Sequence, residues 1–215
     1  MMRIWRAAAL AAATLATTIP AAAADGDLPR ISGTFGVGVA NPLHGDLSFN
    51  AFAWQTSVRV ATSRHMVIEP FYGEWRHTTT RVISGVTIQG PGGVLGQVDR
   101  ITQRTEETRP AVGFNVLGAW SAGRVTVLAG GGPGVLLFRR HFTETLEGCH
   151  GANVRCTGVD NRFSSGSFDV QAVAGLDVTV ASRFGVFGEF RLAVPVEDIG
   201  SGQTSVVGGV RVRIW

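Results

Sequence analysis

The chain has 215 residues, of which 45% are hydrophobic, and its formal net charge is +3. So small an excess of positive charge gives no support to nucleic-acid binding, and the length suits one domain of ordinary size. All 19 basic residues counted as Lys or Arg are arginine. A GC-rich genome accounts for this bias, and the alternative is selection for bidentate phosphate binding at a lipopolysaccharide surface.

The N-terminal stretch has the layout of a cleavable secretory signal. Arg3 and Arg6 precede a short apolar run rich in alanine and leucine, and small residues follow up to Ala24. The apolar run is too short to span a bilayer. We therefore expect residues 1–24 to be removed, residues 25–215 to form one domain, and the protein to leave the cytoplasm. A retained membrane anchor is the alternative.

Eight segments of the remaining chain alternate between apolar and polar residues, as β-strands do. In chain order they are RISGTFGVGVA, WQTSVRVA, MVIEPFYGEWRH, RPAVGFNVLGAW, VTVLAGGGPGVLLFRR, FDVQAVAGLDVTV, FGVFGEFRLAV and SVVGGVRVRIW. The longest apolar stretch, residues 125–138, is too short for a transmembrane helix and contains the helix-breaking GGGPG. High hydropathy without a helical span is typical of a transmembrane β-barrel.

The connections between these segments alternate in length. Three are short, and four are long; the short ones are residues 62–65, 121–123 and 181–183, and the long ones are about 40–53, 78–107, 142–162 and 195–203. This pattern predicts an all-β fold, an eight-stranded antiparallel up-and-down transmembrane β-barrel with both termini on the periplasmic side.

The polar faces of the segments carry charges of both signs. We expect these side chains to point into the barrel and to pair there, because desolvated ions need partners. They are Arg59, Glu69, Glu74, Arg76, Arg109, Asp169, Asp177, Glu189, Arg191, Arg211 and Arg213. Strict alternation would put Glu69 and Glu74 on opposite faces, so we predict a one-residue bulge at Pro70 that turns both inward and turns Phe71, Gly73 and Trp75 outward.

An eight-stranded barrel is just wide enough for side chains to fill its interior. We therefore expect a plugged, salt-bridged lumen, with a narrow gated channel as the alternative. Aromatic residues near the segment ends are expected at the two membrane interfaces. These are Trp54 and Trp75 on the long-loop side, and Trp120, Phe184 and Trp215 on the short-turn side.

Two cysteines, Cys149 and Cys156, lie in the third long connection, and we expect them to form a disulfide. A metal site that adds His150 and perhaps His141 is the alternative, but the spacing is not that of a zinc site. The set His141, Thr143 and Glu144 could form a nucleophile and its base, although ordinary polarity at the rim explains it better. We expect no catalytic, metal or cofactor site.

The second long connection, residues 78–107, contains two β-branched runs around GPGG. This pattern predicts a hairpin in which the third and fourth strands continue beyond the membrane. Its backbone edge could pair with another chain. The alternative is a flexible loop that shields the barrel mouth.

The chain resembles the small outer-membrane β-barrel family, whose eight-stranded members are similar to outer-membrane proteins A and X. The resemblance covers the mature chain and rests on the signal peptide, the GGGPGV and VAGLDV patterns and the terminal VRVRI. It implies a bacterial outer-membrane location, contact with outer-membrane lipid and lipopolysaccharide, and folding by the barrel-assembly machinery. Trp215 lies one residue out of phase with the hydrophobic positions Val210, Val212 and Ile214, which departs from the family's C-terminal pattern.

From these observations we expect a non-enzymatic outer-membrane barrel with a structural role or a surface-interaction role through its extracellular loops. The segments 78–107 and 142–162 are the candidate sites for a protein partner. Two alternatives remain: a lipid A-modifying outer-membrane enzyme, and a soluble barrel of lipocalin type that binds a small ligand.

Overall fold

A computed structural model describes residues 30–43, 51–90, 93–151, 156–197 and 202–214. The expected signal peptide and Trp215 lie outside the described residues. The strands are β1 (Ile31–Pro42), β2 (Ala51–Ser63), β3 (Met66–Gly90), β4 (Gly93–Ala122), β5 (Val125–His150), β6 (Val159–Thr179), β7 (Phe184–Pro195) and β8 (Gln203–Arg213). Each strand pairs antiparallel with its neighbours in chain order, and β8 pairs with β1. The predicted eight-stranded antiparallel barrel is therefore confirmed.

The outer face of the barrel is an apolar belt. Side chains that alternate along each strand place large hydrophobic residues outward, where a third to three quarters of each is exposed, and Phe168 is 71% exposed. The belt includes Phe35, Val37, Val58, Val112, Phe114, Val116, Val170, Leu176, Val186, Phe190, Val206 and Val210. The described part of the chain offers no helix of the length and apolarity that a membrane crossing needs.

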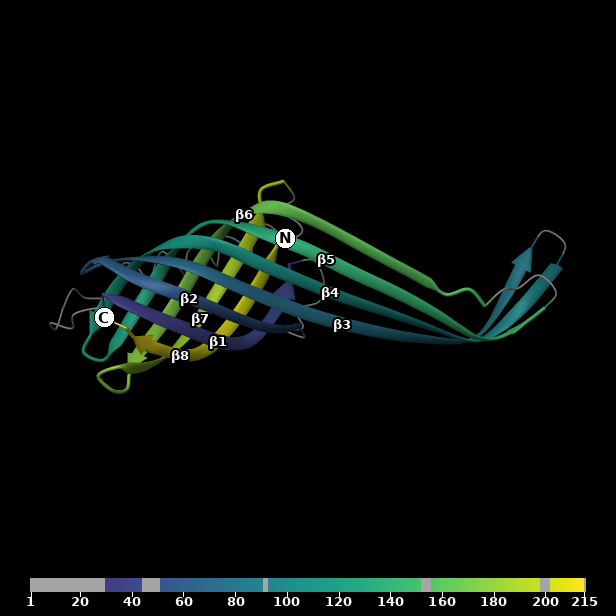
Figure 1. The fold of residues 1–215 in the computed structure, drawn as a ribbon, viewed down its shortest axis with the longest axis horizontal. Helices are drawn as coiled ribbons and strands as arrows, with labels where there is room; N and C mark the ends of the chain where they lie inside the picture. Colours follow the sequence, from purple (N-terminus) through teal and green to yellow (C-terminus); the bar gives the residue numbers. More distant parts are fainter. Residues whose placement is uncertain (1–29, 44–50, 91–92, 152–155, 198–201, 215) are drawn as a thin grey trace, which may run out of the picture.

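Four of the strands are much longer than the other four. β1, β2, β7 and β8 have 11 to 13 residues, close to the length needed to cross hydrocarbon at a tilt. β3, β4, β5 and β6 have 25, 30, 26 and 21 residues. Figure 1 shows these four strands running together far beyond the mouth of the barrel. We call the protruding part, residues 77–90, 93–107, 139–151 and 156–167, the extension.

The extension lies on the side of the long connections. The short connections β2–β3, β4–β5 and β6–β7 lie at the other end of the barrel, together with the start of β1 and the end of β8. The predicted hairpin of the third and fourth strands is present, since β3 and β4 pair as far as Gly90 and Gly93. The segments 78–107 and 142–162 are nevertheless largely strand rather than loop, because β5 and β6 extend beside this hairpin.

The predicted bulge at Pro70 is wrong. β3 keeps one register with β4 from Met66 to Ile88, and Pro70 pairs with Phe114 without a shift. Strict alternation therefore turns Glu69, Phe71 and Trp75 inward and turns Glu74, Arg76 and Tyr72 outward. Trp75 is 3% exposed, and it packs among three inward-facing alanines, Ala40, Ala51 and Ala53. These small side chains leave room for the indole ring.

Candidate functional site: a closed interior and a protruding sheet

A network of ion pairs crosses the barrel interior. Arg59 on β2 donates from Nε to Glu69 at 2.5 Å, from Nη1 to Asp177 at 2.9 Å and from Nη2 to Glu189 at 2.9 Å. These carboxylates belong to β3, β6 and β7, so one guanidinium contacts three other strands of the wall. Arg59 is 4% exposed and Glu69 is fully buried.

Arg191 on β7 completes this network. Its Nη2 lies 3.0 Å from Glu69 and 2.7 Å from Glu189, and its guanidinium stacks 3.9 Å from the centre of the Phe71 ring. Arg211 contributes a longer contact of 3.5 Å to Asp177. Three arginines thus face three carboxylates, which offsets the cost of burying each charge.

Neutral amide side chains fill the remaining hydrogen-bonding positions. Gln55 donates to Glu189 at 3.0 Å and Asn115 donates to Glu69 at 3.3 Å. Gln171 accepts from Arg191 at 3.1 Å and donates to Asp169 at 2.9 Å. These amides are not among the charged residues expected inside, although each shares the inward phase of the charged residues on its strand.

The ends of the interior are packed with apolar side chains. One cluster contains Trp75, Phe187 and Val207, and a second contains Val67, Leu117 and Leu128. Trp75 donates from its indole nitrogen to Gln203, and the guanidinium of Arg109 lies 4.6 Å from the Trp75 ring centre. The interior is thus occupied along its length by side chains.

The other residues expected inside are placed as follows. Arg109 points inward at the mouth and Asp169 is buried, whereas Arg213 is exposed at the end of β8. Glu74 and Arg76 lie on the outer face and pair with each other, which corrects their predicted inward placement. Glu74 is beside Trp54 at the top of the belt, so the arginine compensates its charge close to the membrane edge.

The expected interface aromatics divide between the two faces. Trp54 lies outward at the long-loop end, with its ring 5.4 Å from Tyr72 and 6.5 Å from Phe35. Trp120 and Phe184 are 38% and 58% exposed near the short turns. Trp75 is not an interface residue, because it is buried inside the barrel.

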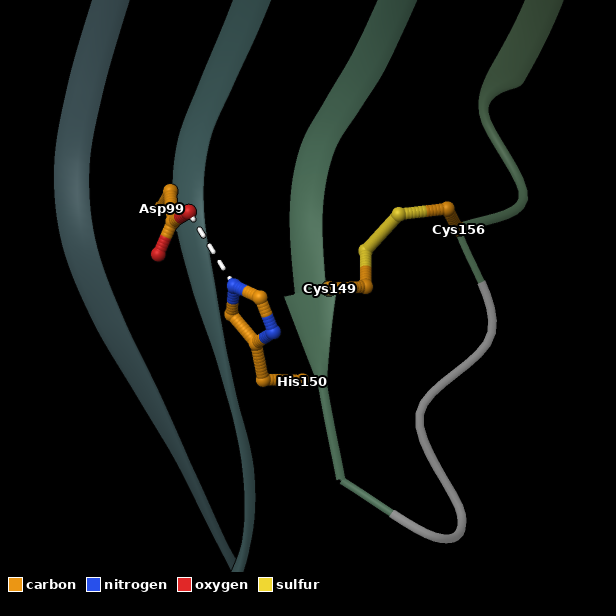
Figure 2. Close-up of a disulfide and its surroundings, with 4 residues drawn as sticks. All are labelled: Asp99, Cys149, His150 and Cys156. Atoms are coloured by element: carbon orange, nitrogen blue, oxygen red, sulfur yellow. Dashed lines mark hydrogen bonds and ion pairs between the residues drawn. A yellow bond between two sulfur atoms is a disulfide. The ribbon is translucent and has the colours of Figure 1, made fainter.

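The far end of the extension carries the disulfide. Cys149 at the end of β5 is bonded to Cys156, with Cα atoms 5.9 Å apart, and this confirms the predicted pairing. Figure 2 shows His150 turned toward Asp99 on β4, with Nε2 3.2 Å from a carboxylate oxygen. Among the described residues no three His, Cys, Asp or Glu side chains are grouped closely enough to hold a metal ion.

The candidate catalytic residues His141, Thr143 and Glu144 do not form a catalytic relay. Thr143 Oγ1 and Asp160 Oδ1 both lie near Nε2 of His141, at 3.4 and 2.8 Å. A nucleophile and an orienting acid need opposite ring nitrogens. Glu144 accepts from Gln103 at 2.7 Å, and alternation puts it on the other face of β5 from His141. The arrangement holds strands together rather than activating the threonine.

The extension leaves two sheet edges unpaired. β2 accompanies β3 up to the pair Phe52–Arg76, and β7 accompanies β6 down to Asp169. Among the described residues, therefore, no strand lies beside residues 77–90 of β3 or residues 159–167 of β6 on those sides.

No family model and no curated protein matches the sequence. A search of solved structures found small eight-stranded outer-membrane β-barrels. One is the attachment invasion locus protein Ail of Yersinia pestis, with 9% identity and a TM-score of 0.42 over 84% of this chain and 95% of that chain. Another is the Neisserial surface protein A, with 11% identity and a TM-score of 0.41 over 86% and 96% of the two chains.

A major outer-membrane protein of Thermus thermophilus matches with 12% identity and a TM-score of 0.44, over 86% of this chain and 98% of that chain. The chain has the fold of the small eight-stranded outer-membrane barrels. The interior of this barrel is filled by its own side chains, and β3 to β6 continue beyond the apolar belt.

Proposed function

We propose that this protein is embedded in the bacterial outer membrane and presents its extension at the cell surface as an interaction platform. One observation carries the proposal: four adjacent strands continue beyond the apolar belt as a sheet with free edges. At about 3.4 Å per residue, strands that exceed the others by roughly ten residues or more reach tens of ångströms above the bilayer.

The free edge of β3 is the best candidate for pairing with a partner chain. Residues 77–90 are rich in β-branched side chains and hold one arginine, no lysine and no proline. Edges that avoid pairing usually carry lysine, proline or a bulge. The register of β3 with β4 shifts between Ile88 and Gln89, so the part before this shift is the one suited to pairing. An extended segment of a partner could add a strand here through main-chain hydrogen bonds.

The two alternatives considered from the sequence find less support. A lipocalin-type carrier needs a hollow interior and a polar exterior, whereas this barrel has a charged, filled interior and an apolar belt. A lipid-modifying enzyme needs an activated nucleophile, and the His141 cluster lacks the geometry for one. Outer-membrane lipid and lipopolysaccharide surround the proposed barrel, and the barrel-assembly machinery would insert it.

Epitope accessibility on intact cells tests the proposed location and orientation. An epitope inserted in the hairpin turn between Gly90 and Gly93 should bind antibody on intact cells. The matched control carries the same epitope in the short turn between Gly123 and Arg124, and it should bind only after the outer membrane is permeabilised. Equal accessibility of the two epitopes, or recovery of the folded protein from the periplasm without detergent, would reject the proposal.

A further inference from the structure

An open depression lies where β4, β5 and β6 leave the belt. It encloses about 370 Å³ and is lined by Glu106, Thr108, Arg139, His141, Arg162 and Ser164, among others. Cross-strand pairing arranges these six residues in two rows. The row nearer the barrel is Thr108–Arg139–Ser164, and the farther row is Glu106–His141–Arg162.

The nearer row lies at the height expected for lipid headgroups. Val112, Val135 and Phe168 form a cross-strand row of the apolar belt, and Arg139 is four residues beyond Val135 on the same face of β5. Four residues span about 14 Å along a strand, and the tilt of barrel strands shortens this distance along the membrane normal. In the proposed embedding, Arg139 therefore lies beyond the apolar belt, at the level of the lipid headgroups.

The charges of the depression are ordered along the strands. Arg139 is exposed and makes no ion pair with a carboxylate of the described residues, whereas its chain neighbour Arg140 lies 3.8 Å from Glu107. The carboxylates lie farther from the membrane: Asp160 is 3.8 Å from Arg162, and Glu106 is engaged by Arg104 at 2.5 Å. An anion that approaches from the membrane side meets Arg139 first.

Two hydroxyl groups flank this arginine. Thr108 and Ser164 are the cross-strand partners of Arg139, and neighbouring strands are about 4.8 Å apart. A planar guanidinium with a hydroxyl donor on each side matches the several acceptor oxygens of a phosphate group, which arginine binds in bidentate fashion.

We infer that Arg139, Thr108 and Ser164, together with Arg162, form a binding site for a phosphate monoester of an outer-leaflet glycolipid. The phosphate occupies the nearer row, the sugar fits in the depression, and the acyl chains lie along the belt beside the exposed Phe168. This inference rests on the proposed membrane embedding and names the lipid that one face of the barrel recognises.

The test uses the purified full chain in non-ionic detergent and bis-phosphorylated lipid A as the probe, with bound lipid counted by native mass spectrometry during a titration. Arg139→Gln should weaken binding about ten-fold, the loss expected for one charge-assisted hydrogen-bonded pair. Arg81→Gln is the matched control, because Arg81 is an exposed arginine on the opposite face of the extension, and it should bind as the unaltered protein does.

Two further arms separate the glycolipid from other sources of the same chemistry. The unaltered protein and Arg139→Gln should bind dephosphorylated lipid A equally. Inorganic phosphate should compete only weakly with lipid A for the site. The pair Thr108→Ala and Ser164→Ala keeps the arginine and should weaken binding by a few-fold, which provides a second test if Arg139→Gln folds poorly.

Equal binding by Arg139→Gln and Arg81→Gln, or equal binding of phosphorylated and dephosphorylated lipid A, would overturn the inference. Full competition by inorganic phosphate would reduce the site to a general anion site and would also overturn it. Heat-modifiable gel migration shows whether each variant is a folded barrel, so a failure of this site is distinguishable from a failure of membrane embedding.

Discussion

Individual residues of the interior show why this barrel tolerates so much buried charge. Glu69 is fully buried and contacts Arg59, Arg191 and Asn115, so its charge is compensated from three other strands. Such a network costs desolvation energy when it forms, but removing one partner leaves the others uncompensated. The interior is therefore sensitive at residues such as Glu69, which have several partners.

Glu69→Ala should lower the free energy of unfolding by about 3–5 kcal/mol, because two buried arginines lose a carboxylate. Urea titration of the barrel refolded in lipid vesicles, followed by tryptophan fluorescence, measures this change. Glu147→Ala is the control, since Glu147 is 61% exposed and 4.0 Å from Arg100, and it should cost less than about 1 kcal/mol. Similar losses in the two variants would contradict the assigned role of Glu69.

Residue-level prediction from sequence placed most of the interior charges correctly, but it misplaced Glu74, Arg76 and Trp75. The inward phase of Arg59, Asp177 and Glu189 follows from alternation alone. The prediction for Trp75 is wrong because it rests on a bulge at Pro70 that would keep the Glu74 carboxylate away from lipid, and β3 has no such bulge. The pairing of Glu74 with Arg76, and the space left by small alanines, become visible only when the strand register is known.

At the scale of the strands, the wall is shaped by glycines on β5. A Cβ at Gly132 would fall on the carbonyl oxygen of Phe114 and within 3.0 Å of the Asn115 Cα. Backbone from the neighbouring strand occupies this space and has little freedom to move. Gly188 on β7, by contrast, has nothing within 4 Å of such a Cβ.

Gly132→Ala should therefore destabilise the barrel by about 1–3 kcal/mol through overpacking. Gly188→Ala should be neutral or stabilise it by a few tenths of a kcal/mol, because alanine restricts the unfolded chain. The same urea titration compares the two variants. A loss at Gly188 as large as that at Gly132 would show that backbone crowding is not the reason for glycine on β5.

The extension was only half predictable from sequence. The β-branched runs around GPGG predict a β3–β4 hairpin, whereas the sequence-based prediction for residues 142–150 is a loop. Phe142 and Leu146 share a face that Thr143 and Thr145 do not, which is a strand pattern. The presence of polar residues and a nearby disulfide obscured it. The depression around Arg139 could not be found, since its rows exist only through the register of β4, β5 and β6.

At the scale of the whole molecule, the filled interior predicts that the barrel does not conduct ions. Ion pairs from Arg59 reach β3, β6 and β7, and Arg191 adds a second link across the interior at the same level. An ion that passed through the barrel would therefore have to displace charged side chains that are held by several partners.

In planar bilayers the unaltered protein should give no discrete conductance steps. Arg59→Ala together with Arg191→Ala removes both crossings and leaves carboxylates around the lumen, so this variant should show cation-selective steps if it folds. Discrete conductance steps from the unaltered protein, as large as those of the double variant, would mean that the network does not close the barrel. Glu147→Ala is the control for a change of charge at the surface, and it should give no steps.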